Sequence, residues 1–199
     1  MKLAPPLTDG IVSLEKTIKT RRTVRQFSAK PLTGEQLSQL LWAAQGITDG
    51  RGYLRAAPSA GALYPTDLYV VAGEEGITGF EAGVYRYEAE YHSLVRTAKG
   101  DRRREIARAS LGQRWMGEAP LQLIITVEYT RITFKYGERG VRYAMIEAGH
   151  IGQNIFLQAE SLGLGAGIVG AFDDEAIIGT AGIPKTHRPL LIMPVGYKG

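Results

Sequence analysis

The segment 142–162 most constrains what this chain can fold into, because its helical periodicity leaves it apolar on most faces. A helix that is apolar most of the way round is buried. In a chain of 199 residues, such a helix is either the centre of a monomer or part of a subunit interface. Gly149 and Gly152 would let a second helix approach closely, and His150 is expected to be a hydrogen-bonded core histidine. The apolar positions are Ala144, Met145, Ala148, Ile151, Ile155, Phe156, Ala159 and Leu162.

This apolar segment does not predict a membrane span. Glu147, Gln153 and Glu160 interrupt it, and a bilayer would leave these polar groups without partners. The first residues lead into no apolar segment of the kind a signal peptide needs, so we expect a cytoplasmic protein. The absence of cysteine excludes a disulfide scaffold, an iron–sulfur protein and a thiol nucleophile. The three histidines lie far apart, so no metal site is expected.

The order of predicted elements indicates an α+β or α/β protein made of a single domain over residues 1–199, because strands and helices alternate. Ser13, Thr33 and either Asp173 or Asp174 are candidate helix caps, and Gly46, Gly163 and Gly182 follow helix ends. The β-branched run 121–128 predicts a central strand. The other predicted strands are 68–72, 83–87, 91–96, 167–169 and 190–195, and the helices are 14–20, 34–45, 102–110, 142–162 and 174–181.

The basic residues suggest an anionic ligand, because the net charge is +4 and the pI is about 9.3. Arg21, Arg22 and Arg25, with the hydroxyl of Thr23 between them, suit a phosphate, since arginine supplies charged bidentate donors. A solvated basic turn is the alternative. Nucleic acid is a further alternative for this run and for Arg102–Arg104, but no zinc-finger, basic-zipper or RNA-recognition signature accompanies them.

Three further motifs each have a functional and an ordinary interpretation. The segment 57–65 is rich in small residues and could press its backbone against an aromatic ring, or be a surface loop. Residues 165–170 match G-x-G-x-x-G, but a helix precedes them and no helix follows directly, so we reject a Rossmann site. Their glycines either admit a flat ligand or form a plain connection. Lys135 and Tyr136 are an acid–base pair if a pocket desolvates the amine, and otherwise exposed loop residues.

Together these motifs resemble the nitroreductase family of flavin enzymes, and within it the SagB-type dehydrogenase branch. The resemblance runs from about Ser13 to Tyr197 and keeps the motifs in the same order. It implies an FMN-binding α+β fold with a mostly antiparallel central sheet flanked by helices, in an intertwined homodimer. The motifs are 21–27, 40–47, 58–65, Lys135–Tyr136, 146–154, 163–174 and 194–197.

The resemblance also implies roles for particular residues. The residues that would hold the phosphate and the pyrimidine side of the flavin are Arg21, Arg22, Thr23 and Arg25. Those that would flank the flavin from the partner subunit are Pro58, Ser59, Ala60 and Gly61. Those that would lie along the ring, with a backbone N–H near N5, are Ile168, Val169 and Gly170. Cationic donors near N1 and O2 would stabilise the reduced ring.

Departures from the family pattern affect the expected chemistry. Many nitroreductases carry asparagine and glutamine where this chain has Ala62 and Tyr64, a change that suits the SagB-type branch. Lys198 is the one candidate for the basic residue that follows the last strand. We expect hydride transfer from NAD(P)H to a nitroaromatic, a quinone or another electron-poor acceptor. The alternative is an azoline or C–N dehydrogenase reoxidised by oxygen, with Lys135 as the base and Tyr136 as its helper.

Overall fold

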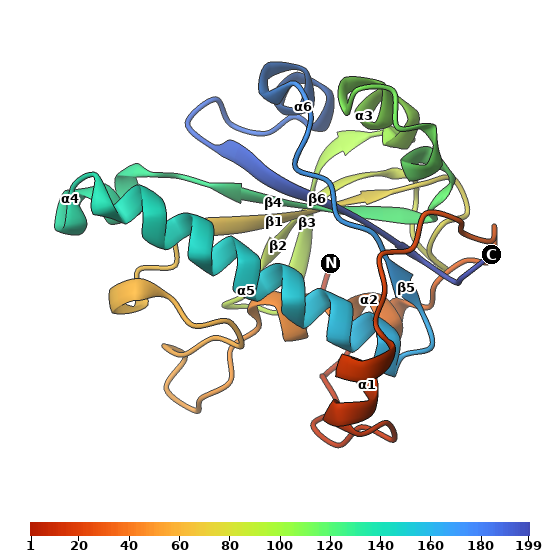
Figure 1. Cartoon of the computed structure of the whole chain (residues 1–199), viewed down its shortest axis with the longest axis horizontal. Helices are drawn as coiled ribbons and strands as arrows, with labels where there is room; N and C mark the ends of the chain where they lie inside the picture. The colour runs from red at the N-terminus through yellow and green to blue at the C-terminus, as the bar shows by residue number, and fades with distance from the viewer.

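A six-stranded sheet forms the centre of the computed structural model, which describes all residues 1–199 (Figure 1). Its strand order is β3-β2-β1-β4-β6-β5, and all neighbouring strands are antiparallel. All residues of β4 are buried because this strand lies between β1 and β6, which confirms the predicted central strand. The strands are β1 Thr66–Ala72, β2 Gly83–Glu88, β3 Ser93–Lys99, β4 Leu121–Val127, β5 Gly165–Ala166 and β6 Arg188–Gly196.

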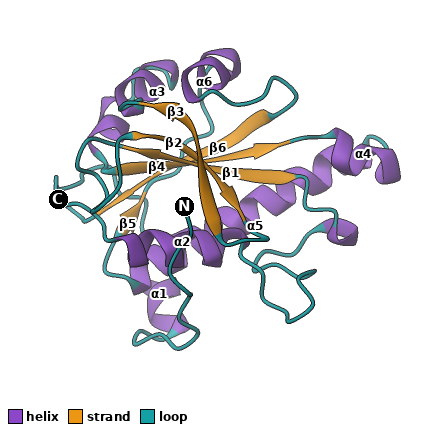
Figure 2. Cartoon of the chain, turned by 180° about the vertical axis from the view of Figure 1, so that it is seen from behind, coloured by secondary structure: helices purple, strands orange, loops and turns teal.

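Helices cover both faces of the sheet, so the expected α+β fold is confirmed (Figure 2). On one face, α2 and α5 pack over the larger core, and α1 packs against α5. On the other face, α3, α6 and the short 3-10 helix η2 enclose a second core. The helices are α1 Leu14–Thr20, α2 Gly34–Gln45, α3 Arg103–Ala109, α4 Thr130–Tyr136, α5 Arg139–Ser161 and α6 Asp174–Ala181, with 3-10 turns η1 Ala60–Ala62 and η2 Arg114–Glu118.

Local capping chemistry sets several helix ends where the sequence predicts them. The Ser13 side chain accepts a hydrogen bond from Lys16 N, and Thr33 forms a capping box with Gln36. Asp173 caps α6, which ends at Gly182 in the left-handed region. These caps satisfy backbone N–H groups that a helix start leaves without partners.

Three expectations about local structure are wrong. Lys135 and Tyr136 lie on α4 rather than in a loop. The strand expected at 167–169 forms instead at Gly165–Ala166, and Val169 makes only an isolated bridge to Ile192. His150 is exposed and is no core histidine, because it lies on the outer face of α5. No helix is long and apolar enough to cross a membrane.

The outer face of α5 is exposed along much of its length. Met145 and Ile146 expose 55% and 47% of their surface. A side chain placed at Gly149 would meet no atom within 4 Å. His150 and Gln153 continue the same exposed stripe at helical spacing. The sequence pattern therefore overstates how much of this helix one chain buries.

Candidate active site

The predicted phosphate-binding arginines follow the C-terminus of α1. The Arg21 guanidinium lies 5.3 Å from the Phe156 ring centre, over the last turns of α5. Thr23 forms a parallel bridge to Ala166, and Val24 N donates to Ala166 O at 2.9 Å. This pairing fixes the segment beside β5.

The charges of this segment are free to meet an anion. None of Arg21, Arg22 and Arg25 forms an ion pair with a carboxylate. Lys198 lies in the same region, because it bridges Phe27 and contacts the Cβ position of Gly165. Its Nζ pairs with Glu160 Oε2 at 2.8 Å. Burial acts to raise the pKa of Glu160, but Lys198, the Thr20 hydroxyl and the Arg22 guanidinium together outweigh it and lower that pKa. The Arg21 and Arg25 guanidinium groups fit a phosphate. Arg22 Nη1 already donates to Lys19 O at 3.0 Å and to Arg21 O at 2.7 Å, and Glu160 engages Lys198.

The glycine-rich segment 165–170 has two uses. A side chain at Gly165 would collide with Val24 at 2.7 Å, and one at Gly167 would collide with Trp115 at 2.7 Å, so both glycines serve packing within the chain. Gly170 is exposed, and a side chain there would make only an ordinary contact with Leu191 Cδ2 at 3.9 Å. Ile168 is partly exposed, and its Cδ1 lies 3.8 Å from the Cβ position of Gly152, near the middle of α5. The exposed backbone around Ile168 and Gly170 is the part that a flat ring could approach.

The segment 58–64 has a strained backbone. Gly61, Ala62 and Tyr64 have φ values of 63°, 52° and 45°, and the last two are not glycines. Such conformations cost energy for residues with a Cβ and cluster at functional sites. Ser59 Oγ accepts a hydrogen bond from Tyr64 N at 3.0 Å, which ties the two ends of the strained turn together.

The structure brings Lys135 and Tyr136 to this strained segment. A Cβ added at Gly61 would lie 2.7 Å from the Tyr136 hydroxyl and 3.0 Å from Lys135 Nζ. Tyr136 packs edge-on against Tyr143 of α5, with ring centres 5.3 Å apart. The predicted acid–base pair and the predicted flavin-flanking segment therefore form one cluster, built from α4, α5 and η1.

The two clusters of predicted residues lie far apart in one chain. Tyr143 marks the Lys135 cluster, and Phe156, thirteen residues later on α5, marks the arginine cluster. The helical rise separates these two points by about 20 Å. Figure 1 shows the same arrangement, with α4 at one end of α5 and α1 near the other. One chain thus holds two separate clusters of predicted site residues.

A buried carboxylate that the sequence analysis did not single out as functional lies behind the strained segment. Glu147 is 1% exposed, and its Oε1 accepts hydrogen bonds from Thr66 Oγ1 at 2.6 Å and Gln45 Nε2 at 3.3 Å. Burial raises the pKa of Glu147, although the neighbouring polar side chains and the Arg55 guanidinium oppose the shift. The signal available in the sequence was an acidic residue at an inward position of an apolar helix.

A second charged network anchors the start of α4. Arg131 bridges Asp67 at 2.7 Å and Glu128 at 2.6 Å. The buried His187 lies 3.6 Å from each of these carboxylates. Burial lowers the pKa of His187, and the Arg131 guanidinium adds to that effect while the two carboxylates oppose it. The network joins β1, β4 and β6 to the helix that carries Lys135.

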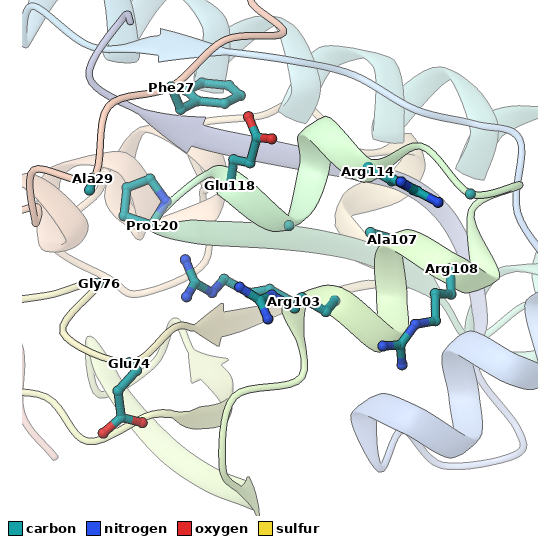
Figure 3. A pocket seen from close by; sticks show the side chains of 13 residues that line it. Phe27, Ala29, Glu74, Gly76, Arg103, Ala107, Arg108, Arg114, Glu118 and Pro120 are labelled. Atoms are coloured by element: carbon teal, nitrogen blue, oxygen red, sulfur yellow. The ribbon is translucent and has the colours of Figure 1, made fainter.

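A large cavity lies away from the predicted site residues. It is an open groove of about 1030 Å³ between α3, η2 and two loops, and it contains none of the predicted site residues (Figure 3). The Arg103 guanidinium is held by Asp101, with a shortest distance of 2.6 Å. The side chains of Arg108 and Arg114 point in different directions, so they do not converge on one anion (Figure 3). We therefore do not assign the site to this groove.

Several known proteins are similar to this chain in sequence or in structure. The family model described as "Nitroreductase family" matches residues 18–197. MJ1384 of Methanocaldococcus jannaschii, assigned as a nitroreductase, is 46% identical over 187 residues, which cover 94% of this chain and 92% of that protein. The microcin B17-processing protein McbC of Escherichia coli is 27% identical over 164 residues, which cover 80% of this chain and 60% of McbC. A solved structure from Ralstonia eutropha JMP134, also assigned as a nitroreductase, superposes with a TM-score of 0.86 at 29% identity over 100% of this chain and 88% of that one.

Proposed function

Because this chain belongs to the nitroreductase family, we propose that it is an FMN-dependent oxidoreductase that works as a homodimer. The proposed reaction moves a hydride from NAD(P)H to a small electron-poor acceptor, such as a nitroaromatic or a quinone, in two half-reactions at one site. Bound FMN would supply the chemistry by taking up and releasing a hydride at N5. The protein needs no nucleophile for this reaction, which agrees with a chain without cysteine.

One observation carries the homodimer in this proposal: the candidate residues form two half-sites at opposite ends of α5. The exposed stripe of Met145, Ile146 and Gly149 lies between them. If two copies pack α5 against α5 in antiparallel orientation, the arginine cluster of one copy meets the Lys135 cluster of the other. The two-fold symmetry of such a dimer makes two complete sites from four half-sites.

Within this site, each cluster has a distinct task. Arg21, Arg22 and Lys198 would bind the phosphate as charged donors, and Arg25 with Thr23 would hold the pyrimidine side of the ring. The backbone from Ile168 to Gly170 would orient the ring by donating an N–H near N5. The partner's segment Pro58–Gly61 would cover the ring and exclude water from it.

The alternative reaction runs in the oxidative direction on an azoline or another C–N bond. The observation that favours it is the contact of Lys135 and Tyr136 with the strained segment at Gly61. Lys135 would take the proton that the substrate loses with its hydride, and oxygen would be the final electron acceptor. The name of McbC, a microcin-processing protein, points to a peptide substrate in that relative.

Absorbance spectroscopy of the purified protein tests the proposal. We expect a yellow protein whose flavin band bleaches when NADH or NADPH is added without oxygen. A colourless protein that takes up no added FMN would overturn the proposal. Lys135→Ala then separates the two reactions, because normal bleaching with loss of substrate turnover supports the dehydrogenase.

A further inference from the structure

Two arginines of the segment that follows α1 are held by aromatic rings rather than by carboxylates. Arg21 Cζ lies 5.3 Å from the ring centre of Phe156, and Arg25 Cζ lies 5.8 Å from that of Trp115. Neither guanidinium forms an ion pair, whereas Arg103 pairs with a carboxylate at 2.6 Å. A carboxylate neutralises a guanidinium and occupies its N–H donors. An aromatic face attracts the same group but leaves its charge and its donors available.

Trp115, on η2, receives two side chains from the segment 23–27. Phe27 stacks on the indole, with ring centres 6.4 Å apart and an angle of 23° between the ring planes. Arg25, two positions earlier, places its guanidinium over the same side chain. Isolated bridges fix both ends of this segment, at Thr23 and at Phe27, so its backbone cannot easily carry Arg25 away from the indole.

The indole also touches the second segment that is predicted to meet the flavin. A Cβ at Gly167 would lie 2.7 Å from Cη2 and Cζ3 of Trp115, so the indole packs directly against this backbone. Gly167 N donates to Pro194 O at 2.8 Å, which fixes the same backbone to β6. Gly167 directly precedes Ile168, where the predicted ring-facing stretch begins. Trp115 therefore contacts both the segment that carries Arg25 and the segment that leads into this stretch.

Trp115 is itself well anchored. Its ring packs against the second core, and the next residue, Met116, is fully buried. Met116 O accepts a hydrogen bond at 2.9 Å from the side chain of Gln122, a buried residue of β4. The close packing of such a core leaves the ring little freedom to move. Trp115 is thus a fixed surface on which the Arg25 guanidinium rests.

We propose that Trp115 is a positioning residue that holds Arg25 as an uncompensated cation beside the pyrimidine side of the flavin. The inference rests on the proposed function only in that Arg25 faces the flavin. Trp115 itself touches no reacting atom in this account. Because its aromatic face sets the place of the guanidinium before flavin binds, the charge is already positioned to stabilise the reduced ring more than the oxidised ring.

Proton NMR on the protein without flavin tests the hold of Trp115 on Arg25. We compare Trp115→Leu, which removes the aromatic face, with Trp115→Phe, which keeps one. Trp42→Leu is the matched control, because Trp42 is the other tryptophan of the chain and takes part in no cation–π contact. Trp115→Met is the second route to the same lesion if Trp115→Leu does not fold, because methionine fills irregular space without an aromatic face.

The expected result is a change confined to the Arg25 side chain. In the wild type, the Cδ protons of Arg25 should resonate upfield of the usual arginine position, because they lie near the face of an aromatic ring. Trp115→Leu should abolish this shift, Trp115→Phe should keep most of it, and Trp42→Leu should leave it unchanged. The same Arg25 resonances in Trp115→Leu and wild type would overturn the proposal.

The midpoint potential of the flavin-loaded protein provides a readout beyond turnover. Trp115→Leu should weaken binding of reduced FMN about three- to tenfold more than binding of oxidised FMN, which lowers the two-electron potential by about 15–30 mV. Trp115→Phe should keep this ratio within about twofold of wild type. In an Arg25→Ala background, Trp115→Leu should change the potential no further, because Trp115 acts through Arg25. An unchanged potential in Trp115→Leu, or fully additive effects of the two substitutions, would overturn the proposal.

These outcomes separate the inference from the proposed function. If the wild-type protein binds no FMN, the proposed function fails, and the Arg25 resonances alone support or overturn the hold of Trp115 on Arg25. If FMN binds and Trp115→Leu leaves the potential unchanged, the positioning role is wrong and the flavin site stands.

Discussion

Replacing Gly61 by alanine separates backbone strain from the geometry of the site. Gly61 has a φ of +63°, and its missing side chain leaves room for Tyr136 and Lys135. An added Cβ would lie 2.7 Å from the Tyr136 hydroxyl, whereas ordinary contact begins at 3.4 Å. The hydroxyl must therefore retreat by about 0.7 Å, a shift comparable to the misplacements that cost enzymes up to 10²-fold in rate.

Gly79→Ala is the matched control for this substitution. Gly79 has a φ of +79°, and a side chain there meets nothing within 4 Å. The left-handed conformation should cost each variant about 1–2 kcal/mol in free energy of unfolding. For a chain of this length, that corresponds to a fall in Tm of about 2–8 °C in both variants.

The assay compares thermal unfolding with NAD(P)H-dependent turnover for the two variants. Both should lose similar stability, but Gly61→Ala should lose about tenfold or more in kcat/KM while Gly79→Ala stays within about twofold of wild type. Equal turnover in the two variants would refute the reasoning. It would mean that the contact of Gly61 with Tyr136 and Lys135 has no part in the site.

The remaining predictions concern the cofactor, the dimer and pH. Arg21→Ala and Arg25→Ala should each weaken FMN binding by about tenfold or more, because a charged hydrogen bond contributes about 1.5–3 kcal/mol. A fluorescence titration measures this affinity, and a wild-type value in either variant would contradict the prediction. Ile146→Arg should convert the dimer to a monomer, as measured by light scattering, and this monomer should bind no flavin. A flavin-loaded dimer of this variant would argue against the α5 interface. Burial raises the pKa of Glu147 above its usual value of 4.5, so the folded state favours the protonated acid. The stabilisation that this group contributes is therefore lost as the pH rises from about 4.5 through the raised pKa. The difference in unfolding free energy between Glu147→Gln and wild type, followed by urea titration, should therefore grow with pH, and a pH-independent difference would contradict the buried acid.

The parts of the fold that depend on local chemistry could be predicted from the sequence. The caps at Ser13, Thr33 and Asp173 satisfy backbone groups within one turn, so their signal is complete in a few letters. The run 121–127 is apolar at nearly every position, and only a strand buried on both faces requires that. These elements can be predicted without knowing which distant residues they contact.

The errors arise where contacts with residues distant in the sequence determine the local structure. The helix α4 carries only one fully buried side chain, Ile132, and is anchored through Arg131 to Asp67, which lies in another strand. Its own periodicity is therefore too weak to predict it. His150 was expected in the core because the segment 142–162 is apolar on most faces, yet it lies with Met145 and Ile146 on the exposed face. The fold of one chain does not bury the apolar residues on that face, and we propose that a second chain covers them.

For the site, the sequence indicated candidate residues but not which of them lie next to each other in one chain. Lys135, Tyr136 and Gly61 are more than seventy positions apart at the extremes, and only the packing of α4 and η1 on α5 joins them. In the sequence, Glu147 is only a polar residue that interrupts an apolar segment. Its hydrogen bonds come from Thr66 and Gln45, which belong to other elements, so the sequence alone does not predict its buried network. The family resemblance already implied a site that needs two chains, and the distance between the two clusters along α5 supports that proposal.

A mixed dimer tests the central claim most directly. One protomer carries Arg21→Ala with Arg25→Ala, the other carries Gly61→Glu, and two different affinity tags select dimers that contain both. Each variant alone should bind no flavin. If every site combines the arginines of one copy with the Gly61 segment of the other, one site of the mixed dimer has neither lesion, and the dimer should hold a single FMN and about half of the wild-type turnover. A mixed dimer without flavin would show that each site lies within one chain.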